Sequence, residues 1–243
     1  MKKLILALVL CLPRAGMPQQ VFLIEDTIAT KDVPVNAFII NMPNDFDEAI
    51  ANYKKFLKEE YKLKVKKENS NTYVIEAVDL PHLSVKRGDL KAYLLPTDSM
   101  NIMAFSFLLG YDIFLDSKNY PEEMDQFKNY VVRYMDFNYR TYYTNQIEQL
   151  TKELDGAKKE LMQSENKIIS WRKKSISLHK KASKEKDDTK KMQLDSENQQ
   201  LERNIMSTAS QLPGMRLHIN EKGMELFRMK DELNTYHQLI TSL

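Results

Sequence analysis

The chain has 243 residues, which is enough for one ordinary domain with an appendage. Charged residues make up 29% of it and glycines number only 6, a composition that favours long helices over a loop-rich fold. The formal net charge of +2 gives no strong whole-molecule field, which argues against a nucleic-acid partner.

Residues 1–20 have the pattern of a signal peptide. Lys2 and Lys3 supply a positive start, and the apolar run 4–12 follows them. This run is too short to span a bilayer as an ordinary transmembrane helix, and no later segment is apolar enough to do so. The sequence therefore predicts a secreted protein of the periplasm or cell envelope, with no transmembrane segment in the mature chain.

Cys11 is the only cysteine of the chain, and it lies inside this leader. A lipoprotein leader needs a small residue before the acylated cysteine, whereas Leu10 occupies that position here. We therefore interpret Cys11 as an apolar leader residue that is removed on export. The mature chain would then contain no cysteine, which excludes disulfides and thiol catalysis.

Residues 21–120 show a mixed pattern of strands and one helix, and we predict that they form an α+β domain. Asn44 is expected to cap a helix whose apolar face runs from Phe46 to Tyr61. The turn at 69–71 is expected to join two strands as a hairpin. The predicted strands cover 21–24, 35–41, 62–68, 72–78, 90–95, 102–109 and 113–115.

A second helix is expected to begin at Pro121, because proline suits the first helical turn and Glu122 and Glu123 suit the positive end of the helix dipole. Its buried stripe would consist of Met124, Phe127, Val131 and Tyr134. A small antiparallel sheet with helices on one face buries such stripes most simply. This element order resembles the α/β unit of the TATA-box-binding-protein type, which recurs in uncharacterised exported bacterial proteins. The resemblance covers about the first half of the mature chain and implies a fold without any functional residue.

Residues 121–243 are predicted to continue this helix into a long C-terminal antiparallel hairpin of the coiled-coil type. Apolar residues recur there at alternating spacings of three and four, as the seam between packed helices requires. The central seam residues are Leu150, Leu154, Leu161, Ile168, Leu226, Leu233 and Ile240. The polar stretch 183–190 marks the tip, where Asp187 or Asp188 is expected to cap the returning helix, and Pro213-Gly214 predicts a kink. The same stripe also suits pairing between chains, so the sequence leaves the oligomeric state open.

The sequence contains no recognisable catalytic, cofactor-binding or metal-binding pattern. The four histidines are far apart, and none belongs to a metal-ligand spacing. There is neither a Gly-rich phosphate loop nor a nucleophile-elbow pattern. These observations predict a protein that is not an enzyme and that needs no cofactor.

A basic segment close to the predicted tip is a candidate interaction site. It contains Arg172, Lys173, Lys174, Lys180, Lys181 and Lys184, with no acidic residue among them. Such a tip could bind anionic lipid headgroups, lipopolysaccharide or an acidic client. The alternative is a solvated helical face whose charge is balanced by Asp195, Glu197 and Glu202 of the facing helix.

The sequence as a whole favours an exported, non-enzymatic protein whose helical arm mediates protein–protein interaction or self-association. A periplasmic holdase chaperone is the first alternative, since a compact base with helical arms is similar in outline to the Skp type. The arm here follows the base, however, instead of interrupting it. Binding of a polyanion or an envelope surface by the basic tip is the second alternative.

Overall fold

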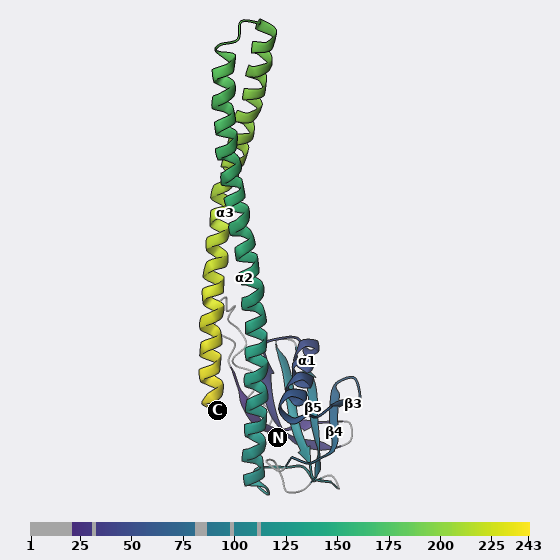
Figure 1. Cartoon of the computed structure of the whole chain (residues 1–243). Helices are drawn as coiled ribbons and strands as arrows, with labels where there is room; N and C mark the ends of the chain where they lie inside the picture. Colours follow the sequence, from purple (N-terminus) through teal and green to yellow (C-terminus); the bar gives the residue numbers. More distant parts are fainter. Residues whose placement is uncertain (1–20, 31–32, 81–86, 98–99, 111–112) are drawn as a thin grey trace. The chain divides into compact units, whose positions relative to one another are not determined.

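The computed structural model describes residues 21–30, 33–80, 87–97, 100–110 and 113–243 (Figure 1). The predicted leader therefore lies outside the described residues. The chain divides into two compact units. The first, which we call the sheet unit, consists of Met1–Tyr142 and Glu232–Leu243, and the second, which we call the arm unit, consists of Tyr143–Asp231.

The sheet unit contains a six-stranded antiparallel sheet with the strand order β1-β2-β6-β5-β4-β3. The strands are β1 (Leu23–Ala29), β2 (Pro34–Met42), β3 (Lys66–Lys67), β4 (Thr72–Val78), β5 (Gly88–Pro96) and β6 (Asn101–Leu108). The predicted antiparallel sheet is thus confirmed, including the hairpin formed by β3 and β4.

Three strands differ in extent from the prediction. The first strand begins and ends later than predicted, and the segment 113–115 contributes only an isolated bridge between Phe114 and Leu108. The predicted strand 62–68 is reduced to two residues, Lys66–Lys67. The reason is that Lys62 has a positive φ of 58°, which ends the preceding helical turn and delays the extended backbone.

Two helices pack on the same face of the sheet, as predicted. Helix α1 (Phe46–Phe56), extended by the π-helical turn η1 (Leu57–Tyr61), and helix α2 (Pro121–Ala182) both contact Phe105 of β6. The rings of Tyr53 and Tyr134 lie 5.4 and 5.3 Å from the ring of Phe105, and 5.0 Å from each other. All three rings are fully buried, so the core of this unit is largely aromatic.

Asp45, and not the predicted Asn44, caps α1. The Asp45 carboxylate accepts a hydrogen bond of 2.8 Å from the backbone N–H of Glu48. Asn44 is buried instead, and its side chain forms two hydrogen bonds with Asn138 of α2, at 3.1 and 2.9 Å. The Asn138 oxygen also accepts a hydrogen bond of 2.7 Å from Asn52 of α1. Three buried amides therefore join the β2–α1 connection, α1 and α2.

The end of the chain completes the sheet unit. Helix α3 (Asp188–Thr241) returns there, and its Tyr236 lies 5.1 Å from Tyr139 between ring centroids. At Leu243, the carbonyl oxygen accepts a hydrogen bond from the Lys128 amine of α2. The expected boundary at 120/121, with an arm that follows its base, differs from the observed division. Residues 121–142 and 232–243 both belong to the sheet unit, where they bury aromatic side chains, so the arm unit interrupts it.

The arm unit is the predicted antiparallel hairpin of two long helices, formed within one chain (Figure 1). Residues 183–187 connect α2 to α3, inside the range expected for the tip. Asp187 is the cap of α3, since its carboxylate accepts hydrogen bonds from the backbone N–H groups of Thr189 and Lys190. Helix α3 continues through Pro213, so the proline does not end it.

Candidate interaction surfaces of the helical arm

The seam of the hairpin follows the predicted spacing. Within the arm unit, Leu150, Leu154 and Ile168 are buried, and Leu161 and Leu226 are partly buried. In the sheet unit, Ile240 is buried and Leu233 is partly buried. The seam residues thus have a structural role, because they fill the space between two helices of the same chain.

Ion pairs along the arm unit fix which parts of the two helices face each other. Glu153 of α2 pairs with Lys222 of α3, Glu165 pairs with Arg216 at 2.8 Å, and Lys174 pairs with Glu197 at 2.5 Å. The hydrogen bond from Lys222 holds the pKa of the Glu153 carboxyl below its ordinary value. Because most of these side chains are exposed, each pair adds little stability, but together they show one antiparallel register.

One polar seam position is incompletely satisfied. The Asn198 amide nitrogen donates a hydrogen bond of 3.1 Å to Glu202, whereas its buried side-chain oxygen has no partner among the described residues. An unsatisfied buried oxygen costs about 1–3 kcal/mol. Polar seam residues of this kind weaken a coiled coil and restrict the registers that it can adopt.

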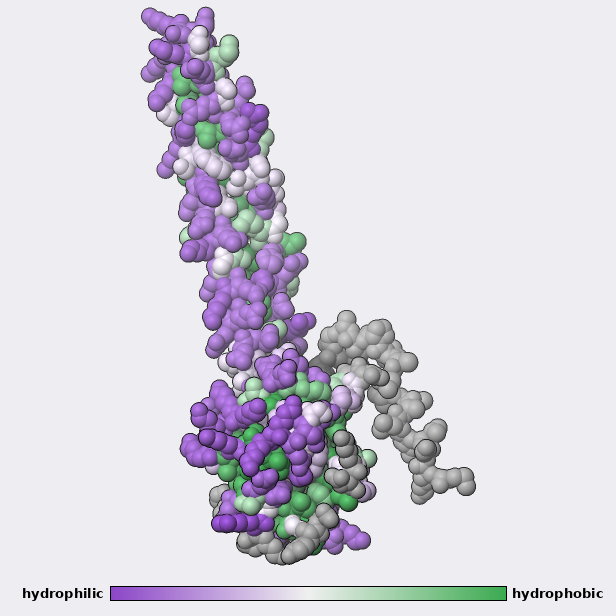
Figure 2. Space-filling model, turned by 90° about the vertical axis from the view of Figure 1, so that its right-hand side faces the viewer, coloured by the Kyte–Doolittle hydropathy of each residue, from purple (hydrophilic) through white to green (hydrophobic). Residues whose placement is uncertain are grey.

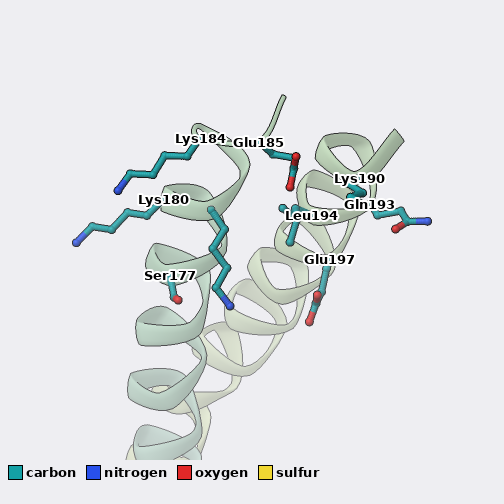
Figure 3. Close-up of a pocket in the computed structure, with 9 residues that line it drawn as sticks. Ser177, Lys180, Lys184, Glu185, Lys190, Gln193, Leu194 and Glu197 are labelled. Atoms are coloured by element: carbon teal, nitrogen blue, oxygen red, sulfur yellow. The ribbon is translucent and has the colours of Figure 1, made fainter. Parts of the chain in front are cut away.

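The structure brings the basic segment to the end of the hairpin. Lys180, Lys181 and Lys184 line an open hollow of about 780 Å³, together with Ser177, Glu185, Lys190, Gln193, Leu194 and Glu197 (Figure 3). Figure 3 shows Lys180 and Lys184 pointing outward from α2, away from Lys190 and Gln193 on α3. The hollow can attract an anion, but its walls are exposed side chains.

Within the part of the chain that the structure describes, one member of the predicted basic site forms an ion pair. Among the described residues, Lys174 forms the ion pair with Glu197, while no ion pair joins the other five to an acid. Those five are Arg172, Lys173, Lys180, Lys181 and Lys184. Of the acids expected to balance them, Asp195 and Glu202 are therefore not paired with this segment, and most of its positive charge faces solvent.

A second set of residues, missed in the sequence analysis, forms exposed apolar stripes on both helices of the arm unit. Figure 2 shows hydrophobic patches that interrupt the otherwise hydrophilic surface of the arm. The large exposed side chains are Met162, Ile169 and Ile176 on α2, and Met192, Met206, Leu217, Met224 and Phe227 on α3. The spacing of seven between Met162, Ile169 and Ile176 was the available signal, but the stronger seam pattern beside it masked this stripe.

An apolar groove lies between α2 and α3 of the arm unit, at the level of residues 154–158. It has a volume of about 710 Å³ and is lined by Leu154, Lys158, Leu217, Ile219, Asn220, Gly223, Met224 and Phe227. Gly223 leaves open space in the wall, since a Cβ atom there would meet nothing within 4 Å. The groove therefore exposes parts of the seam, and it suits an apolar side chain from a partner.

The described residues give little support for other kinds of site. They hold no group of three or more His, Cys, Asp and Glu side chains arranged to bind a metal ion. None of the helices in the described part of the chain is both long and apolar enough to cross a membrane. The exposed surfaces of the arm are accordingly the strongest candidates for function.

Comparison of the chain with protein-family models, with curated proteins and with solved structures finds no match. The resemblance to the TATA-box-binding-protein type thus depends on element order alone and stays a prediction.

Proposed function

We propose that this is an exported, non-enzymatic protein whose helical arm mediates protein–protein contact or self-association. The observation that carries the proposal is the combination of a seam filled within the chain and large apolar side chains left outside it. Phe227 is 76% exposed, and Met206 and Met224 are each 66% exposed. Exposed apolar groups that line up on one element are typical of surfaces that a partner covers.

The chemistry of the arm also favours a protein partner. Methionine is flexible and polarizable, and it is used on surfaces that adapt to an apolar partner. The groove between Leu154 and Phe227 offers such a partner a concave apolar site on a rigid helical support. Export to the periplasm or cell envelope is proposed from the leader pattern in residues 1–20.

Site-specific photo-crosslinking in living cells tests this proposal. A photoreactive amino acid is placed at Met162, Leu217 or Phe227, which lie on the exposed apolar stripes. Matched positions at Gln163 and Asn234, which are exposed and polar, serve as controls. We expect discrete covalent protein adducts at the three apolar positions and fewer at the controls. Equal yields at all five positions would refute the proposal.

The basic tip supports a second candidate function, the binding of an anionic surface. Five of its six cations form no ion pair among the described residues, so they remain available to phosphate groups. We expect salt-sensitive binding to vesicles that contain anionic lipid, and weaker binding after Lys180→Gln with Lys181→Gln. The control variant is Lys152→Gln with Lys159→Gln, which removes the same charge from exposed positions of the same helix. Equal losses in the two variants would exclude the tip.

A further inference from the structure

We propose that the exposed apolar face of the arm unit is self-complementary, and that a second copy of this chain packs on it in the antiparallel direction. This inference rests on the proposed function and names the partner. It commits to a two-fold symmetric dimer in which the α2 stripe of each copy, Met162, Ile169 and Ile176, covers the groove of the other copy.

The α2 stripe and the groove lie on the same side of the hairpin. Lys158 forms part of the α2 wall of the groove. Met162, Ile169 and Ile176 follow Lys158 by 4, 11 and 18 residues, which correspond to about one, three and five helical turns. The stripe therefore extends the α2 wall of the groove toward the tip. On α3, Met206 precedes Leu217 by 11 residues and so continues the opposite wall in the same way.

The α2 stripe and the groove lie at different levels along the arm unit. The pairing of Glu153 with Lys222 places the groove at the level of residues 153–158 of α2. The stripe is centred on Ile169, which is about 14 residues, or roughly 20 Å, closer to the tip. A two-fold axis between these levels brings each stripe onto the groove of the other copy. In such an isologous interface, the stripe and the groove of both copies are buried at the same time.

Charge is distributed unevenly along the arm unit. The tip half, residues 166–216, has 12 Lys and Arg against 6 Asp and Glu. The opposite half, residues 143–165 and 217–231, has 6 Lys and Arg against 8 Asp and Glu. An antiparallel dimer places the positive half of one copy beside the negative half of the other. A parallel dimer would place two positive halves together, so the charges select the antiparallel arrangement.

The area of the proposed interface is large enough for a stable dimer. The overlap would extend from the level of Phe227 to that of Ile176, which covers about 28 residues of α2, or roughly 42 Å. Two helices side by side are about 20 Å wide, so each copy would bury roughly 800 Å². That area matches a standard stable interface between two proteins.

The mass of the purified full-length chain in solution tests the inference. Light scattering across a concentration series should show a particle of about twice the chain mass of 28.5 kDa. Ile169→Asp should raise the dissociation constant at least about tenfold while leaving the circular dichroism unchanged. Met192→Asp is the control, because Met192 is also a large exposed apolar residue, at 73% against 50% for Ile169, but lies beyond the overlap, toward the tip. It should remain dimeric.

Distances between the two tips test the orientation. A spin label is attached to Ser183→Cys in a chain whose native cysteine is replaced, Cys11→Ser. The antiparallel dimer predicts a tip-to-tip distance of roughly 60 Å, since the proposed axis lies about 21 residues from each tip. A parallel dimer would bring the labels within about 25 Å, and that result would overturn the inference.

A monomer at every concentration, or a dimer that survives Ile169→Asp, would also overturn the inference. These outcomes leave the proposed function separately testable. Photo-crosslinked adducts at the apolar stripes with a different protein would support an arm that contacts proteins while refuting self-association. Absence of any stripe-specific adduct would refute both.

Discussion

Asn138 of α2 connects this helix to α1 and to the β2–α1 connection through its side chain. Its oxygen accepts hydrogen bonds from Asn44 and Asn52, and its nitrogen donates to the Asn44 oxygen at 2.9 Å. All three amides are buried, so no solvent molecule at the surface can replace a lost partner. Buried hydrogen bonds of this kind add little net stability while every partner is present. Removing one partner leaves a buried polar group unpaired, which lowers the free energy of unfolding much more.

Asn138→Ala should therefore destabilise the sheet unit by about 2–4 kcal/mol, because it leaves the amides of Asn44 and Asn52 without their shared partner. Urea unfolding followed by the near-ultraviolet circular dichroism of tyrosine measures the change. Asn145→Ala is the control on the same helix, since Asn145 is exposed. A loss below about 0.5 kcal/mol in Asn138→Ala would contradict the structural role of the amide cluster.

Substitution of glycine by alanine should change the stability in opposite directions at Gly88 and at Gly156. A Cβ atom at Gly88 would lie 2.5 Å from the carbonyl oxygen of Leu108, whereas one at Gly156 would meet nothing within 4 Å. Gly88→Ala should destabilise the sheet unit by about 1–3 kcal/mol through overpacking. Gly156→Ala should stabilise α2 by about 0.5–1 kcal/mol, because alanine is the better helix former. Urea unfolding of both variants checks the signs, and a shared sign would contradict the packing around Gly88.

At the scale of elements, the two long helices owe their association to one apolar stripe each. Successive residues of α2 differ sharply in their surroundings, since Ile168 is 5% exposed and Ile169 is 50% exposed. Helical periodicity produces this contrast, because neighbouring side chains point about 100° apart. The contrast separates the residues that hold the hairpin from those that are free to meet a partner.

Ile168→Asp should unfold the arm unit or lower its stability by about 3 kcal/mol or more, because it removes apolar burial and places a charge in the seam. Ile169→Asp, the adjacent control, should leave the stability of the single hairpin within about 0.5 kcal/mol. Fluorescence of Trp171, the only tryptophan, reports on the arm unit during urea unfolding. Similar losses in the two variants would contradict the assigned seam.

The elements that the sequence predicted best are those with a long repeated pattern. The seam residues Leu150, Leu154 and Ile168 could be found because seven-residue spacing is strictly periodic and persists over many turns. The Asn44 cap was assigned incorrectly because Asn and Asp share capping preference, and only the tertiary partner Asn138 decides between Asn44 and Asp45. The basic segment was found from composition, whereas the pairing of Lys174 with Glu197, and of no other member among the described residues, depends on how the facing helix is aligned.

At the scale of the whole molecule, the two units differ in the chemistry of their interiors. Of the 12 tyrosines, all but Tyr143 belong to the sheet unit. Burial raises the pKa of Tyr53, and it raises the pKa of Tyr130 and Tyr134 well above the ordinary value of 10.0. The hydroxyls of Tyr53 and Tyr130 lie 2.9 Å apart, so they also contribute a buried hydrogen bond.

High pH should consequently unfold the sheet unit before the arm unit. The folded state keeps these tyrosine protons where the unfolded chain releases them, so the stability they provide is complete below pH 10 and is lost as the pH rises above it. Each such tyrosine should contribute a loss of about 1.4 kcal/mol per pH unit. Tyrosine circular dichroism should show the transition, with a smaller change in Trp171 fluorescence. Normal titration of every tyrosine in a folded chain would contradict the prediction.

The sheet unit is assembled from two stretches that are far apart in the sequence, with the arm unit inserted between Tyr142 and Glu232. Tyr236 and Ile240, which are 2% and 1% exposed, belong to the second stretch, which the ribosome adds only after the whole arm unit. During synthesis the hairpin can close at its short connection as soon as α3 emerges, because nearby segments meet fastest. The growing chain must therefore complete its arm unit before its sheet unit can become fully packed.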